Sequence, residues 1–152
     1  MQTKNGSAAL VKCAVIALVM CGVSGAAAAA IVAGNKTIER NMKAINKGLS
    51  ELKSLVTDDE KVKESLKLVL NMQRRLLSTK MLKPGVVSEA SKDERDALQR
   101  EFRILINKAL RELIDVEIDI LEGNGDAALE RINGSLSAAI KAGHGKFRPR
   151  KP

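Results

Sequence analysis

The chain has 152 residues, a formal net charge of +8, 45% hydrophobic residues and only 1% aromatic residues. Large aromatic side chains normally fill strand-built cores, so this composition argues against a β-sandwich or a barrel. Abundant Leu, Ala, Lys and Glu favour helices instead. The length fits one domain with a core of its own.

Residues 1–30 have the pattern of a secretory signal peptide. Lys4 and Lys12 precede an uncharged run that starts at Cys13 and ends in the alanines of residues 26–30. We therefore expect a signal peptide over residues 1–30 and a mature domain over residues 31–152. An uncleaved anchor is the alternative, because the uncharged run is long enough to span a membrane. Its many small residues favour cleavage.

Both cysteines, Cys13 and Cys21, lie within the expected signal peptide. The mature chain would then have no cysteine, which excludes a disulfide, a thiolate metal site and covalent c-type haem attachment. Removal of Lys4 and Lys12, with no acidic residue lost, lowers the net charge from +8 to +6.

Two amphipathic helices are expected in the first half of the mature chain. Residues 37–56 form the first, because their apolar side chains alternate in steps of four and three. Thr57 and Glu60 have the spacing of a capping box, which starts the second helix. The expected apolar positions of these helices are Ile38, Met42, Ile45, Leu49, Leu52, Val56, Val62, Leu66, Val69, Leu76 and Leu77.

Two more helices follow a loop over residues 81–90, which Pro84 and Gly85 mark. Residues 91–94 form a second capping box and begin the third helix. Residues 123–125 stop it, Asp126 caps the fourth helix and Pro149 ends that helix. The expected apolar stripes are Phe102, Ile106, Ala109, Leu113, Val116 and Ile120, then Leu129, Ile132, Leu136, Ile140 and His144.

The four helices, joined by two short turns and one longer loop, predict an all-α fold. We expect an antiparallel up-down-up-down four-helix bundle preceded by the signal peptide. In that topology the start of the first helix and the end of the fourth are neighbours. Met42 and His144, the only histidine in the chain, would then face one cavity. A thioether and a neutral imidazole are good ligands for haem iron. Judged from spacing alone, such a methionine is more often a core side chain, and such a histidine more often a surface residue, than a metal ligand.

The order of residues along these helices resembles the soluble cytochrome b562 family. The resemblance extends from Ile38 to Arg148, although Gly143 and Gly145 stand where the family has larger residues. The matching positions are Asn41-Met42, the segment 61–66, Glu101-Phe102-Arg103, the turn at Glu122-Gly123, and His144-Gly145-Lys146-Phe147-Arg148.

This resemblance implies a monomeric, periplasmic b-type cytochrome with one non-covalent haem b per chain. Met42 and His144 would be the axial iron ligands, Phe102 would pack against the porphyrin, and Arg148 would lie near the haem edge or propionates. With both axial positions filled, haem iron transfers single electrons rather than activating oxygen. The expected function is electron transfer and not enzymatic catalysis.

Basic residues are expected at the haem end of the bundle, where they would form a positive collar. The collar would steer an acidic redox partner or an anionic membrane surface. The alternative function is a haem-free periplasmic bundle that binds an anionic partner or envelope component through this end, and it needs neither Met42 nor His144. The expected collar residues are Lys36, Arg40, Lys43, Lys47, Lys146, Arg148, Arg150 and Lys151.

Other functions have little support in the sequence. Secretion and the lack of aromatic platforms beyond two phenylalanines argue against nucleic acid as a partner. A second histidine and a nucleophile–base pair, which catalysis would need, are missing. The third helix carries an acidic stripe of Glu112, Asp115, Asp119 and Glu122, which we interpret as a solvated face.

Overall fold

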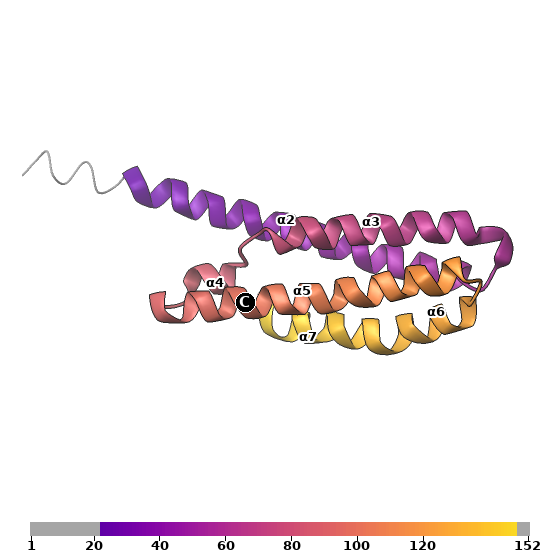
Figure 1. Cartoon of the computed structure of the whole chain (residues 1–152). Coiled ribbons are helices and arrows are strands. Elements are labelled where there is room, and N and C mark those ends of the chain that lie inside the picture. The colour runs from indigo at the N-terminus through magenta and orange to yellow at the C-terminus, as the bar shows by residue number, and fades with distance from the viewer. Residues whose placement is uncertain (1–21, 149–152) are drawn as a thin grey trace, which may run out of the picture.

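The computed structural model of the chain describes residues 22–148, and within them it contains helices and no strand. Figure 1 shows the long helical segments lying side by side, so the prediction of an all-α helical bundle is confirmed. The long segments are α2 (Gly22–Leu55), α3 (Val62–Lys80), α5 (Lys92–Leu121) and a continuous fourth segment of α6 (Gly125–Arg131), the π-turn η2 (Ile132–Leu136) and α7 (Ser137–Phe147).

The helices pack in chain order around one apolar core. α2 contacts α3, α3 contacts α5, and α5 contacts α6, η2 and α7. The most deeply buried side chains recur in steps of three, four or seven along each helix, because only such positions share a face. They include Ile45, Leu52, Val69, Met72, Leu113, Val116, Ile132 and Leu136. Leu77, which the sequence placed on the apolar stripe of α3, is 49% exposed.

The first helix extends back to Gly22, so the predicted start at Thr37 is wrong. The alanines of residues 26–30 have the highest helix propensity, which explains why the backbone stays helical there. Most of the expected signal peptide, including Cys13 and Cys21, lies outside the described residues. Among the helices of residues 22–148, none is long and apolar enough to cross a membrane.

Two predicted helix caps are displaced by one or two residues. Asp58, not Thr57, is the N-cap of the short 3₁₀ helix η1 (Asp59–Lys61), and its Oδ1 accepts a hydrogen bond from the Glu60 N–H at 2.9 Å. Asn124, not Asp126, precedes α6. Neighbouring short polar residues compete for the same turn N–H groups, and the sequence pattern does not decide between them.

The predicted loop over residues 81–90 contains one short helix, α4 (Gly85–Glu89). Its first N–H, that of Gly85, donates to Asn35 Oδ1 at 2.7 Å, which joins the early part of α2 to this connection. Ser91 stands at the N-cap position of α5, as predicted, but the predicted capping box does not form. The Ser91 hydroxyl makes no cap hydrogen bond to a backbone N–H and donates instead to the Glu94 carboxylate at 2.6 Å.

Gly125 lies directly against the turn that follows α2. A Cβ added there would stand 2.4 Å from the Val56 carbonyl oxygen and 3.0 Å from Thr57 Cα. Two backbones therefore meet at this point without a side chain between them, an approach that only glycine allows. The contact fixes where the fourth helical segment begins relative to α2.

We expect Gly125→Ala to lower the free energy of unfolding by about 1–3 kcal/mol, because backbone atoms cannot move aside as a flexible side chain can. Gly134→Ala is the matched control in the same helical segment. A Cβ at Gly134 meets no atom within 4 Å, so we expect this variant to be about 0.5 kcal/mol more stable than the wild type. Urea denaturation measures both, and equal midpoints for the two variants would contradict this close approach.

Candidate functional site

A cavity of about 480 Å³ lies between α2, α5 and α7. α2 packs mainly on α3 and α7 packs mainly on α5, so the first and last helices leave space between them. The volume lies in the range of ligand-binding cavities. The lining is largely apolar and includes Ile38, Leu76, Pro84, Leu105, Ile106, Ala109, Ala139 and Ile140.

The structure brings together all four residues that the sequence analysis selected. Met42 lines the cavity from α2, Phe102 from α5, and His144 and Arg148 from the end of the fourth segment. The Phe102 ring is buried, Met42 and His144 are half-buried, and Arg148 is exposed. The thioether and the imidazole therefore line one cavity although they lie far apart in the sequence.

The surroundings of His144 favour the neutral form of its imidazole. Burial lowers the pKa of His144 below its ordinary value, and the positive charge of Arg148 lowers this pKa further. Within residues 22–148 the imidazole makes no hydrogen bond. A neutral ring has one nitrogen with a free lone pair, which is what a metal ligand requires.

Two contacts fasten the turn that carries His144. The rings of Phe147 and Phe102 meet edge to face, with centroids 5.2 Å apart and planes at 66°. On the neighbouring position, Lys146 Nζ donates to Glu101 Oε2 at 2.5 Å. Both contacts join the last turn of α7 to α5. Lys146 and Phe147, which follow His144 closely in the sequence, therefore help to position His144.

Small side chains on two helices leave the room for this cavity. Ala109 on α5 and Ala139 on α7 both line it, and Gly143 adds a third position without a bulky side chain. The apolar spacing predicts Ala109 as a member of the α5 stripe but does not distinguish it from the larger members of that stripe. Small residues on two stripes near the same end of a bundle were the signal that could have located the space in advance.

Part of the expected positive collar borders the cavity. Lys36, Lys43 and Arg148 contribute to its lining, whereas Arg40 and Lys47 are exposed on α2 away from it. Lys43 also pairs with Glu39 at 2.8 Å. Lys146 does not line the cavity either and pairs with Glu101, while Arg150 and Lys151 lie outside the described residues. Glu39 also lines the cavity and offsets Lys43, so Lys36 and Arg148 give the lining its net positive charge.

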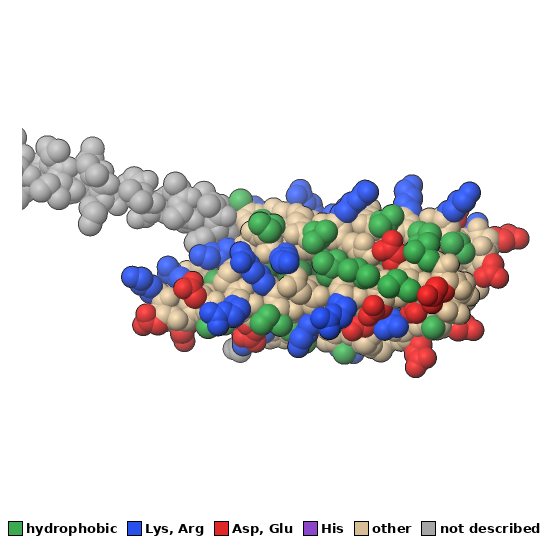
Figure 2. All heavy atoms as spheres, in the orientation of Figure 1, with side chains coloured by type: hydrophobic (Ala, Val, Ile, Leu, Met, Phe, Trp, Pro, Cys, Tyr) green, Lys and Arg blue, Asp and Glu red, His purple; other side chains and the backbone are tan. Residues whose placement is uncertain are grey.

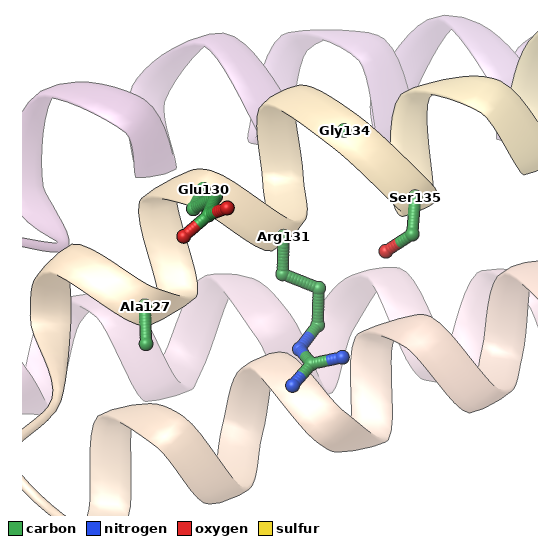
Figure 3. A pocket seen from close by; sticks show the side chains of 5 residues that line it. All are labelled: Ala127, Glu130, Arg131, Gly134 and Ser135. Atoms are coloured by element: carbon green, nitrogen blue, oxygen red, sulfur yellow. The ribbon is translucent and has the colours of Figure 1, made fainter.

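A second hollow, of about 370 Å³, lies on the outside of the fourth segment at the π-turn. Its lining residues all come from α6 and η2, and they are Ala127, Glu130, Arg131, Gly134 and Ser135 (Figure 3). The guanidinium of Arg131 points across to α5, where its Nε donates to Asp119 Oδ2 at 2.9 Å. This hydrogen bond raises the pKa of Arg131, as do the nearby charges of Asp115 and Glu112.

The acidic stripe on α5 is therefore only partly a solvated face. Asp119 is 13% exposed and Glu112 is 22% exposed, because Arg131 lies over them. The interpretation as a fully solvated face is wrong for this part of the stripe. The sequence shows the spacing of the carboxylates, but not the cation that another helix supplies.

No family model matches the sequence, and no curated protein is significantly similar to it.

We expect Phe102→Ala to lower the free energy of unfolding by about 3–5 kcal/mol, because it leaves a void and removes the edge contact with Phe147. Phe102→Leu keeps most of the buried volume and should cost clearly less. Amide hydrogen exchange of residues 143–147 should accelerate in the alanine variant. Unchanged exchange there would mean that the Phe102 ring does not hold the histidine turn.

Gly145→Ala should stabilise the last turn of α7 by up to about 1 kcal/mol, because alanine is the better helix former and a Cβ there meets no atom within 4 Å. Gly145 is exposed and does not line the cavity. Gly123→Ala is the control, since Gly123 has φ of +76° and alanine is strained in that region. Thermal denaturation should move in opposite directions for the two variants.

Proposed function

We propose that this protein is a b-type cytochrome that binds one haem b per chain without a covalent bond and transfers single electrons. The single observation that carries the proposal is that Met42, Phe102, His144 and Arg148 all line one apolar cavity. The resemblance to the soluble cytochrome b562 family, described above, supports the same assignment.

The proposed topology is the antiparallel up-down-up-down bundle of that family. Two hydrogen bonds support opposite directions for α3 and α5. Gln73 Nε2 donates to the Leu113 carbonyl oxygen at 3.3 Å, and Gln99 Nε2 donates to the Leu82 carbonyl oxygen, also at 3.3 Å. Residue numbers thus rise along α3 as they fall along α5. The approach of Gly125 to Val56 supports the same alternation for the fourth segment.

The residues present fit a haem group better than a bare metal ion. Met42 and His144 offer two ligands, and within residues 22–148 no cluster of three or more His, Cys, Asp or Glu side chains is arranged around a metal site. A structural zinc ion takes four protein ligands, and calcium takes six to eight oxygen ligands. Bound haem would supply a redox-active iron that already carries ligands from the porphyrin, so two protein ligands would be enough to hold it.

Each lining residue has a part in this proposal. The Met42 thioether and the neutral His144 imidazole would hold the haem iron, and an iron held by two protein ligands would transfer electrons rather than activate oxygen. A Met/His pair also raises the reduction potential. The Phe102 ring and the aliphatic lining exclude water, and Arg148 and Lys36 lie where they can offset the charge of the propionates.

The remaining parts of the proposal concern location and partners. We propose that residues 1–30 direct export to the periplasm, where the chain acts as a monomer and not as an enzyme. Lys36, Lys43 and Arg148 at the mouth of the cavity support an acidic redox partner, because a positive mouth attracts such a protein over a Debye length.

Absorption spectra of the oxidised and reduced protein test the proposal, with haem added to the folded chain where needed. We expect a sharp Soret band that shifts on reduction, with resolved α and β bands. His144→Ala should abolish this low-spin spectrum, and Met42→Ala should convert it to a high-spin one, because each variant removes one axial ligand. Circular dichroism checks that both variants remain helical.

Met81→Ala is the matched control for Met42→Ala, since Met81 is 76% exposed and does not line the cavity. Its spectrum should equal that of the wild type. A featureless visible spectrum after haem is added would refute haem binding and favour the haem-free bundle. Low-spin haem in His144→Ala would refute the proposed ligand even if haem binds.

A further inference from the structure

Large exposed apolar side chains gather on one side of the protein, along α3 and α5. Figure 2 shows a band of hydrophobic side chains along this side, with Lys and Arg side chains above and below it and Asp and Glu side chains beside its right-hand part. Soluble monomers seldom expose a contiguous apolar patch of this kind without a partner. The apolar side chains that form the band are Leu70, Leu77, Met81, Ile114, Ile118 and Leu121.

A hydrogen-bonded contact between the two helices places the two apolar stripes next to each other. Gln73 Nε2 donates to Glu117 Oε2 at 2.7 Å and to the Leu113 carbonyl oxygen at 3.3 Å. Leu70 and Leu77 lie one helical turn before and after Gln73, and Ile114 lies one turn before Glu117. We call the combined surface the α3/α5 face.

Positive charges continue both stripes. Lys63, Lys67 and Arg74 follow the spacing of Leu70 and Leu77 on α3, in steps of three and four. On α5 the corresponding cations are Arg100, Arg103 and Arg111. All six of these Lys and Arg side chains are exposed, and within residues 22–148 none of them makes an ion pair.

The α3/α5 face lies on the other side of α5 from the cavity. Phe102, Ile106 and Ala109 are buried and line the cavity, whereas Ile114 and Ile118 are 43% and 45% exposed. A partner on this face would therefore leave the cavity mouth free. The α3/α5 face includes none of Met42, Phe102, His144 and Arg148, so it is available whether or not the cavity holds haem.

We propose that the α3/α5 face docks onto an anionic phospholipid surface. In that arrangement the leucines and isoleucines enter the boundary between headgroups and acyl chains, and the flanking Lys and Arg side chains extend to the phosphates. Each such cation adds to the binding through the negative surface potential. A second copy of the chain fits less well, because the same face would oppose unpaired cations with unpaired cations.

Flotation with vesicles tests this proposal, using the full-length chain throughout so that residues 1–30 contribute equally to every sample. We expect binding to vesicles of phosphatidylcholine with phosphatidylglycerol, and at least about tenfold weaker binding to phosphatidylcholine alone. Lys67→Glu with Arg74→Glu should weaken binding to the anionic vesicles by about tenfold or more. Leu70→Ser with Ile114→Ser should weaken it on both compositions.

Lys53→Glu with Lys141→Glu is the matched control, because it makes the same change of net charge at exposed positions outside the face. It should bind nearly as the wild type does. Equal losses in the two charge variants would overturn the proposal, since net charge alone would then explain binding. Sedimentation analysis showing a dimer that Leu70→Ser disrupts would overturn it in favour of a second copy. Absence of any preference for phosphatidylglycerol would overturn it as well.

Discussion

The arrangement of the candidate site depends on how the end of α7 is held against α5. α7 has its neighbours on one side only, because α2 packs on α3 and leaves the cavity between the first and last helices. The edge-to-face contact of Phe147 with Phe102, and the pairing of Lys146 with Glu101, provide the attachment. The turn that carries His144 contains two glycines, and these two contacts attach it to α5 in addition to the packing of α5 on the rest of the fourth segment.

The fold class could be predicted because the apolar spacing along each helix directly reflects the geometry of an α-helix. Ile45, Leu52, Leu113 and Leu136 are buried where the spacing places them. Predictions that depend on a single turn were less accurate. Asp58 replaces Thr57 as a cap, since adjacent polar side chains can reach the same N–H group and only the local backbone decides between them.

The candidate site could be predicted in its membership but not in its shape. Periodicity places Met42 and His144 on inward faces near one end of the chain's bundle, and the structure brings both to one cavity. Periodicity could not reveal the pairing of Lys146 with Glu101 or the position of Arg131 over the acidic stripe, because each of these contacts joins side chains from different helices. Exposed leucines such as Leu77 show the limit of spacing alone, since a helix can carry a second apolar face.

The π-turn at Ile132–Leu136 gives the fourth segment a particular geometry. In a regular α-helix, residues four apart drift around the axis by about 40° at each step, because one turn takes 3.6 residues. Ala128, Ile132 and Leu136 follow one another in steps of four and all three are fully buried, because the wider turn keeps them in line.

A π-turn accommodates one additional residue, so its loss would rotate everything beyond it by about 100°. The direction in which His144 faces therefore depends on the number of residues in the π-turn, which lies more than one turn earlier in the chain. A single-residue deletion there would change the site without altering any residue that lines it.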